Sequence, residues 1–215
     1  MSCCTPAIAD TNRFFSALAR LHRLRFRVFG FETSQKQLLA GIRAVPLKHA
    51  TVLDIGCGPG YLHQDLLNDD TASWATGVDL SEQMLSEARI LAKANHLISR
   101  TDYQSGDFVA LADELGNADI TLLDKVVCCY PDPEALIKAS LAKTNQLYAL
   151  TYPRDRTSTR IGVAIMAQIL GSLRCSFRPF IHDPEWIETL ISDAGFTLLD
   201  ENKTFSWLTQ VYRRD

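Results

Sequence analysis

The sequence predicts an α/β protein in which a doubly wound sheet carries helices on both faces. Short apolar runs, each long enough for one strand, alternate with longer amphipathic segments along the 215-residue chain. The runs span residues 50–54, 73–78, 101–104, 120–123 and 146–151. Strands that alternate with helices pair in parallel through right-handed crossovers, which place helices on both faces of one sheet. Ligands of such sheets bind at the carboxyl ends of the strands.

The end of the chain departs from this alternation. A helical pattern at 184–194 is followed by Gly195 and by two strand-like runs at 196–199 and 205–212. The short polar link at 200–203 predicts a hairpin between these two runs. The expected sheet therefore has seven strands with an antiparallel terminal strand.

Composition predicts a single domain over residues 1–215. The 47% hydrophobic and 22% charged residues are typical of a chain that buries one sizeable core. We expect four parts, which are an N-terminal helical cap (1–45), a ligand-binding core (46–152), an inserted lid (153–182) and a C-terminal helix with a hairpin (183–215). One apolar face of the cap is predicted from the helical spacing of Phe14, Phe15, Leu18 and Leu21.

Charge and hydropathy exclude several classes of partner. The net charge of -3 provides no general attraction to nucleic acid or to an anionic membrane. The longest apolar segment, 161–170, is about half the length needed to span a bilayer, and no basic, apolar leader opens the sequence. We therefore expect a cytoplasmic protein. Its six cysteines would then be thiols, and no metal site is expected.

The stretch TVLDIGCGPGYLHQDLL, residues 51–67, places Gly56, Gly58 and Gly60 directly after a predicted strand. Glycine tolerates positive φ and lets another molecule approach the backbone. A dinucleotide site would prefer the pattern G-x-G-x-x-G, whereas this turn has D-x-G-x-G-x-G. Asp54 at the strand end disfavours a pyrophosphate and favours a ligand with a cationic centre or an amine.

The motif DIGCGPG, residues 54–60, resembles the first motif of class I S-adenosylmethionine-dependent methyltransferases. The resemblance continues through nearly the whole chain, because GVDLSEQMLSEAR (77–89) is similar to the second motif, a strand that ends in an acid. A carboxylate at Asp79, 25 positions after Asp54, can accept both ribose hydroxyls. The resemblance implies a Rossmann-like sheet and S-adenosylmethionine as the cofactor.

Two further segments are similar to the family. In GDF (106–108), Asp107 can accept from the adenine amine and Phe108 can stack against the ring. ADITLLDKVVCCYPDPEALI resembles the end of the fourth strand and the helix after it, but Cys128 and Cys129 stand where the family often has histidines. The resemblance implies the following cofactor-binding residues: Asp54, Gly56, Cys57, Gly58, Gly60, Asp79, Leu80, Met84, Asp107, Phe108 and Asp124.

A sulfonium donor is already a strong electrophile, so such an enzyme mainly aligns the nucleophile and excludes water. A base is helpful but not obligatory. The candidates for it are His182, Tyr130, Tyr152 and Asp124. Since His182 directly precedes the helix N-cap at Asp183, a structural role is its alternative. Asp124 is either a carboxylate near the amino group of the donor or the end of a strand.

The acceptor is expected to be a small molecule that is methylated at oxygen or nitrogen by a monomer or homodimer. Arg174, Phe177, Arg178 and Phe180 in the lid suit a planar or acidic molecule, and equally a solvated face. The layout resembles the magnesium-protoporphyrin methyltransferase branch only in part, and no porphyrin substrate is assigned.

Other functions stay open at this point. One is methylation of a thiol or another thiophilic substrate, for which Cys3, Cys4, Cys128 and Cys129 are the candidates. Another is a regulatory protein that binds S-adenosylmethionine without catalysis. A nucleic-acid methyltransferase is disfavoured, because CCYP stands after the fourth strand, where an N-P-P-Y-like motif would be expected.

Overall fold

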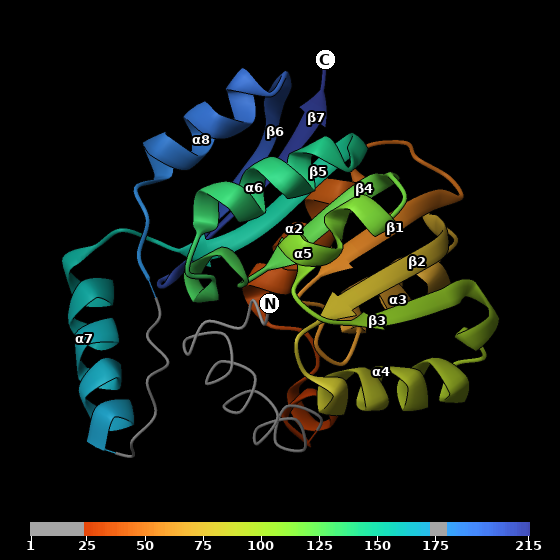
Figure 1. Cartoon of the computed structure of the whole chain (residues 1–215), viewed down its shortest axis with the longest axis horizontal. Coiled ribbons are helices and arrows are strands. Elements are labelled where there is room, and N and C mark those ends of the chain that lie inside the picture. The colour runs from red at the N-terminus through yellow and green to blue at the C-terminus, as the bar shows by residue number, and fades with distance from the viewer. Residues whose placement is uncertain (1–23, 173–179) are drawn as a thin grey trace.

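The computed structural model describes residues 24–172 and 180–215 (Figure 1). The predicted apolar face of the N-terminal cap, the cysteine pair at 3 and 4, and the lid residues 174, 177 and 178 lie outside the described residues. The division of the chain into cap, core, lid and C-terminal segment stays a prediction.

A seven-stranded sheet forms the centre of the molecule, in the order β3-β2-β1-β4-β5-β7-β6. The first five strands in sequence are parallel to one another, and β7 runs antiparallel between β5 and β6. The predicted doubly wound sheet with its antiparallel strand is thereby confirmed. The strands are β1 (Ala50–Ile55), β2 (Ala72–Asp79), β3 (Thr101–Ser105), β4 (Ala118–Asp124), β5 (Thr144–Pro153), β6 (Phe196–Lys203) and β7 (Trp207–Arg214).

The predicted hairpin link at 200–203 is wrong, because β6 continues through Lys203. Asp200 pairs with Val211, Lys203 pairs with Leu208, and the turn follows at 204–206. β6 lies at the edge of the sheet, where polar side chains can face solvent while the backbone still pairs with a neighbour. A polar run at an edge therefore resembles a loop in sequence.

Helices cover both faces of the sheet (Figure 1). α5, α6 and α8 lie on the face toward the viewer, whereas α2 and α3 lie behind the sheet and α4 flanks the β3 side. Side chains alternate along β1, so Val52 joins the core under α2 and α3 and Leu53 joins the core under α6 and α8. The helices are α2 (Thr33–Arg43), α3 (Tyr61–Asn68), α4 (Glu82–Ala94), α5 (Phe108–Leu111), α6 (Pro133–Ala142), α7 (Thr157–Ser172) and α8 (Pro184–Asp193).

Three short 3-10 turns and one helical segment complete the described chain. The turns are η1 (Ile98–Arg100), η2 (Ala112–Glu114) and η3 (Val127–Cys129). Residues 24–29 are helical and end at Gly30, which has a φ of 63°. α7 follows β5 and stands to the side of the sheet in Figure 1. Among the described residues, no helix combines the length and the hydropathy required to cross a bilayer.

α2 is an integral part of the core, which leads to a test of stability. Leu38 on α2 is 0% exposed and packs in the core cluster that includes Val211 of β7. Leu38→Ala should lower the free energy of unfolding by about 2–5 kcal/mol, because a large buried side chain is replaced by a cavity. Urea denaturation measures this loss. Leu199→Ala, at a position 43% exposed on β6, is the matched control and should change stability little; equal losses in both variants would contradict the packing of α2.

Candidate functional site

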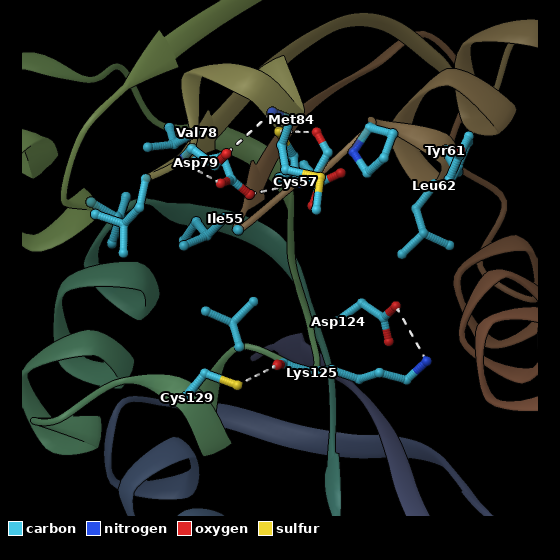
Figure 2. Close-up of a pocket in the computed structure, with 18 of the residues that line it drawn as sticks. Ile55, Cys57, Tyr61, Leu62, Val78, Asp79, Met84, Asp124, Lys125 and Cys129 are labelled. Carbon is cyan, nitrogen blue, oxygen red and sulfur yellow. Dashed lines mark hydrogen bonds and ion pairs between the residues drawn. The ribbon is translucent and has the colours of Figure 1, made fainter. Parts of the chain in front are cut away.

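A cavity of about 600 Å³ lies at the carboxyl ends of β1, β2 and β4. This volume falls within the roughly 300–1,000 Å³ typical of small-molecule sites. One wall consists of the glycine turn, the end of β2 and residues 106–108. The opposite wall contains residues 124–126 and 129–130, Trp207 of β7 and parts of the segment 25–35. Figure 2 shows Asp79, Cys57 and Met84 on the first wall and Asp124, Lys125 and Cys129 on the second.

The glycine turn needs its glycines for two different reasons. Gly56, Gly58 and Gly60 all have positive φ, at 65°, 52° and 77°. A Cβ on Gly60 would lie 2.7 Å from Cε1 of His63, so no larger residue fits there. A Cβ on Gly58 would meet nothing within 4 Å. The backbone at Gly58 therefore borders open space, where a ligand can approach it closely.

Asp79 holds this turn from the end of β2. Its Oδ2 accepts a hydrogen bond from the Gly58 amide at 2.8 Å, and its Oδ1 accepts one from the Ser81 amide at 2.8 Å. Burial raises the pKa of Asp79, although these two amides lower it in part. Leu80 and Met84 lie beside it on the same wall. Each carboxylate oxygen has a further lone pair, so Asp79 can still accept from a ligand.

Asp54 lines the cavity, but its carboxylate already has a buried hydrogen-bond partner. The side chain is buried, and its Oδ2 lies 2.7 Å from Nδ1 of His63. Nε2 of His63 lies 3.1 Å from the Tyr103 hydroxyl, which also accepts from Gln64 Nε2 at 3.0 Å. All of these groups have a matching donor or acceptor if the Tyr103 hydroxyl donates to Nε2 of His63 and the Nδ1–H of His63 donates to Asp54. The predicted attraction of Asp54 for a cationic ligand is therefore shared with a buried histidine.

Asp107 connects the two walls through Tyr130. The Tyr130 hydroxyl donates to Oδ1 of Asp107 at 2.8 Å, and the same oxygen accepts from the Val109 amide at 3.1 Å. Burial, and then the neighbouring Asp107, raise the pKa of Tyr130. The phenol therefore keeps its proton at neutral pH, which argues against Tyr130 as a general base. Phe108 follows Asp107 and is buried in the cavity wall.

Asp124 is the carboxylate at the end of β4. Its Oδ2 accepts from Gln35 Nε2 at 2.9 Å, and Lys125 Nζ lies 4.0 Å from the same oxygen. Oδ1 is buried and accepts no hydrogen bond of good geometry from the described residues. Burial raises the pKa of Asp124, although Lys125 and Gln35 lower it in part. Of the two predicted bases that line the cavity, Tyr130 donates its proton to Asp107, whereas Asp124 has a buried oxygen that can still accept one.

Lys125 was not singled out from the sequence. It is a non-glycine residue with a φ of 64°, and its ammonium lies 2.7 Å from Oε2 of Glu32 and 5.0 Å from the ring centre of Trp207. Glu32 and Lys125 are 93 positions apart in the chain. Gln35 and Asp124 are 89 positions apart. No local pattern signals such pairs, because only the fold brings α2 to the end of β4.

The cysteines differ in their access to the cavity. Cys129 lies in its wall, whereas Cys128 is only 3% exposed and does not line it. Their sulfur atoms are 3.5 Å apart. The hydrogen bond with Cys129, and then burial, raise the pKa of Cys128. Burial, and then the carboxylates of Asp54 and Asp79, raise the pKa of Cys57.

The structure does not bring His182 and Tyr152 to the cavity. His182 Nε2 donates to the Val127 carbonyl oxygen at 3.2 Å, behind η3, and burial lowers its pKa. Tyr152 is 0% exposed, and its hydroxyl donates to Gln210 Oε1 at 2.7 Å within the core. Each uses its polar atom in a hydrogen bond to a partner that does not line the cavity.

Residues 52–144 match a family model described as a methyltransferase domain. This part of the chain is a methyltransferase domain. The match covers the strands and turns that form most of the cavity of this methyltransferase, and the family predicted from the motifs is confirmed. A comparison with curated protein sequences gave no match.

Solved structures share the fold of this methyltransferase. Magnesium protoporphyrin IX methyltransferase from Synechocystis, with bound SAH, is 20% identical with a TM-score of 0.69, over 95% of this chain and 98% of that chain. An O-methyltransferase family protein from Burkholderia thailandensis is 18% identical with a TM-score of 0.67, over 95% and 59%. An O-methyltransferase family 2 protein from Planctomyces limnophilus, in complex with apigenin, is 15% identical with a TM-score of 0.68, over 100% and 63%. At these identities the likeness supports the Rossmann-like fold.

The two aspartates at opposite ends of β4 should respond to substitution with opposite signs. Asp124 has a raised pKa in the folded state, so the methyltransferase gains stability as the pH falls through that value, and ionised Asp124 destabilises it at pH 7. Asp124→Asn should therefore raise the free energy of unfolding at pH 7. Burial alone would raise the pKa of Asp119, but hydrogen bonds from Thr51 and Gln146 lower it. Asp119→Asn should therefore lower stability at pH 7, and less so as the pH falls toward the unfolded value.

Urea denaturation at pH 7 and at pH 5 measures both aspartate effects. Because the two substitutions are chemically identical, each variant is the control for the other. Destabilisation by Asp124→Asn as large as that by Asp119→Asn would show that the Asp124 charge is well compensated in the fold.

Proposed function

We propose that the chain transfers the methyl group of S-adenosylmethionine to an oxygen or nitrogen atom of a small molecule. The observation that carries this proposal is a cavity with two chemically different walls. The wall at β1 and β2 has the glycine turn and three carboxylates, Asp54, Asp79 and Asp107. The wall at β4 has a separate set of polar and aromatic side chains. One cavity therefore has room for a donor beside an acceptor.

The donor wall fits S-adenosylmethionine by its chemistry. Asp79 would accept from the ribose hydroxyls, and the open backbone at Gly58 would let the donor lie close to the turn. Asp107 and Phe108 would hold the adenine, by accepting from its amine and by covering its ring. Asp124, with an oxygen that accepts no good hydrogen bond, suits a positively charged amino group. Cys57, Leu80 and Met84 would complete the apolar contact surface.

The bound donor would supply an electrophilic methyl group on a sulfonium. The residues of this chain then need to hold the acceptor atom in line and to keep water away. Such positioning contributes up to about 7–11 kcal/mol to a two-reactant step. No base is obligatory for this step, and among the predicted bases Tyr130 keeps its own proton, His182 lies outside the cavity and Asp124 would pair with the amino group of the donor.

The thiophilic alternative has limited support from the described residues. Of the two adjacent cysteines only Cys129 reaches the cavity, and its Sγ is already 3.5 Å from the Lys125 carbonyl oxygen. The raised pKa of Cys128 disfavours a thiolate, which is the reactive and metal-binding form. Among the residues that the structure describes, no cluster of three His, Cys, Asp or Glu side chains could hold a metal ion.

Donor binding can be tested directly by calorimetry with S-adenosylhomocysteine. Asp79→Ala should weaken binding by about 1.5–3 kcal/mol, because a charged acceptor is lost. Gly58→Val should weaken it as well, because its side chain would enter the open space at the turn. Asp113→Ala, at an exposed carboxylate of η2, is the control and should bind like the wild type. Normal folding and wild-type affinity in both site variants would show that the donor site has been misplaced.

The acceptor class can be tested with a panel of phenols, amines and thiols. We expect O- or N-methylated products, and a turnover in Cys129→Ala within a few-fold of the wild type, because the thiol only fills space in the wall. Cys128→Ala should lower stability by about 1 kcal/mol without affecting the choice of acceptor. Mass spectrometry identifies the products. Thiol methylation, together with a hundredfold loss in Cys129→Ala at unchanged donor affinity, would favour the thiophilic alternative instead.

A further inference from the structure

Two cations converge on one carboxylate in the cavity wall opposite the glycine turn. Lys125 Nζ lies 2.7 Å from Oε2 of Glu32, and the Arg25 guanidinium pairs with Oε1 of the same residue. All three residues line the cavity. Burial alone would raise the pKa of Glu32, but the two cations lower it, so Glu32 is an anion at neutral pH. The wall thus already contains a site that binds a carboxylate, and it is filled by a side chain of the protein.

The backbone at Lys125 is held in an unfavourable conformation. Its φ of 64° belongs to the left-handed region, which a residue with a long side chain seldom adopts. The Lys125 amide donates to the Thr151 carbonyl oxygen at 2.9 Å, which fixes the residue at the end of β4. Such strain persists where the surrounding structure enforces it, and it clusters at ligand sites. The strain places the Lys125 ammonium over the ring of Trp207 and beside the cavity.

Flat aromatic surfaces border the same cations. Trp207 lies under the Lys125 ammonium. On the Arg25 side, the rings of Phe26 and Tyr61 are stacked with centres 3.6 Å apart and an interplanar angle of 7°. All three aromatic residues line the cavity. A planar ring that carries an anionic group would match both features, since the ring would pack on the aromatic surfaces and the anion would meet the cations.

The remaining charges of the cavity restrict where an anion can bind. Asp54, Asp79 and Asp107 make the donor wall acidic, and Asp124 lies 4.0 Å from Lys125. In the proposed function, the Asp124 carboxylate pairs with the positively charged amino group of the donor. Among the described residues that line the cavity, Arg25 and Lys125 are the lysine and arginine side chains. An anionic acceptor would therefore be repelled from the donor wall and attracted to this pair.

We propose that the acceptor is a planar aromatic molecule with a carboxylate, and that Lys125 and Arg25 bind this carboxylate in place of Glu32. The proposal rests on the proposed function of the same cavity. Glu32 occupies the N-cap position of α2 and forms a capping box with Gln35, in which its side chain accepts from the Gln35 amide, so its carboxylate keeps a partner when an acceptor takes the cations. Negative charge is favourable at that end of a helix. Glu32 thus offsets one of the two positive charges until an acceptor arrives.

Calorimetry with 4-hydroxybenzoate and 4-hydroxybenzamide tests this proposal, because the two probes share a ring and a hydroxyl but differ in charge. The wild type should bind the acid at least tenfold more tightly than the amide. Glu32→Gln should tighten binding of the acid at least threefold, since the internal competitor loses its charge. Lys125→Met should weaken it at least tenfold. A purely structural ion pair predicts instead that both substitutions weaken binding together.

The exposed pair Glu134 and Lys138 on α6 provides matched controls, because Lys138 Nζ lies 2.6 Å from Glu134 Oε1 and neither residue lines the cavity. Glu134→Gln and Lys138→Met should leave both probe affinities unchanged.

Three outcomes would each overturn the proposal. They are equal affinity of the wild type for acid and amide, shifts of the same sign in Glu32→Gln and Lys125→Met, and no binding of the acid to any variant. S-adenosylhomocysteine is measured in parallel. If S-adenosylhomocysteine binds but acid and amide bind equally, only the assignment of the acceptor fails. If S-adenosylhomocysteine does not bind, the proposed function fails.

Discussion

The site depends on the attachment of the glycine turn to the end of β2. The amides of Gly56 and Cys57 both donate to the Val78 carbonyl oxygen, at 2.7 and 3.1 Å. The next amide, that of Gly58, donates to the Asp79 carboxylate. Three successive amides are therefore turned toward the neighbouring strand, which is possible only for a backbone with positive φ on either side of Cys57. The turn cannot shift without β2, so any ligand that uses Asp79 also meets a backbone in a defined position.

The space beneath this turn is filled by a polar network instead of an apolar core. His63 is 0% exposed and both of its ring nitrogens have partners, Asp54 and Tyr103. Such a network is stable only when each member is satisfied, because an unpaired polar group in the interior is destabilising. Its chain of donors ends on Asp54, at the cavity. The protein thus maintains a buried carboxylate in the donor wall through a hydrogen bond from a buried histidine, not by exposing it to water.

Much of the fold could be predicted from the sequence because its signals are local. Each predicted strand from 50–54 to 146–151 overlaps an observed strand, since a buried parallel strand is a continuous apolar run between helical patterns. The motif residues Asp79, Gly58 and Asp107 meet at one cavity because each follows the carboxyl end of a strand. The polar residues 200–203 were predicted as a turn but belong to β6, because a strand at the sheet edge needs no apolar periodicity to pair.

The residues that sequence analysis missed share a different property. Glu32, Gln35 and Trp207 line the cavity from α2 and β7, and β7 is separated from β4 by β5 in the sheet, so these residues reach the cavity only after the sheet has assembled. His63 is separated from Asp54 by 9 positions and from Tyr103 by 40, so no helical or strand spacing marks the set. Conversely, His182 matched a familiar pattern, because it is a titratable residue near an inserted segment. Its Nε2 instead forms a hydrogen bond with the Val127 carbonyl oxygen, away from the cavity.

The two walls of the cavity therefore differ in how they are encoded. The donor wall is built by consecutive residues after β1, β2 and β3, so its geometry follows from local turns that a short motif can specify. The opposite wall is built by single residues from distant elements, held by pairs such as Gln35 with Asp124 and Glu32 with Lys125. A change in one of those residues can alter the charge of the acceptor side without disturbing any turn of the donor side. In the proposed function, that separation would let the acceptor side change while the donor side stays the same.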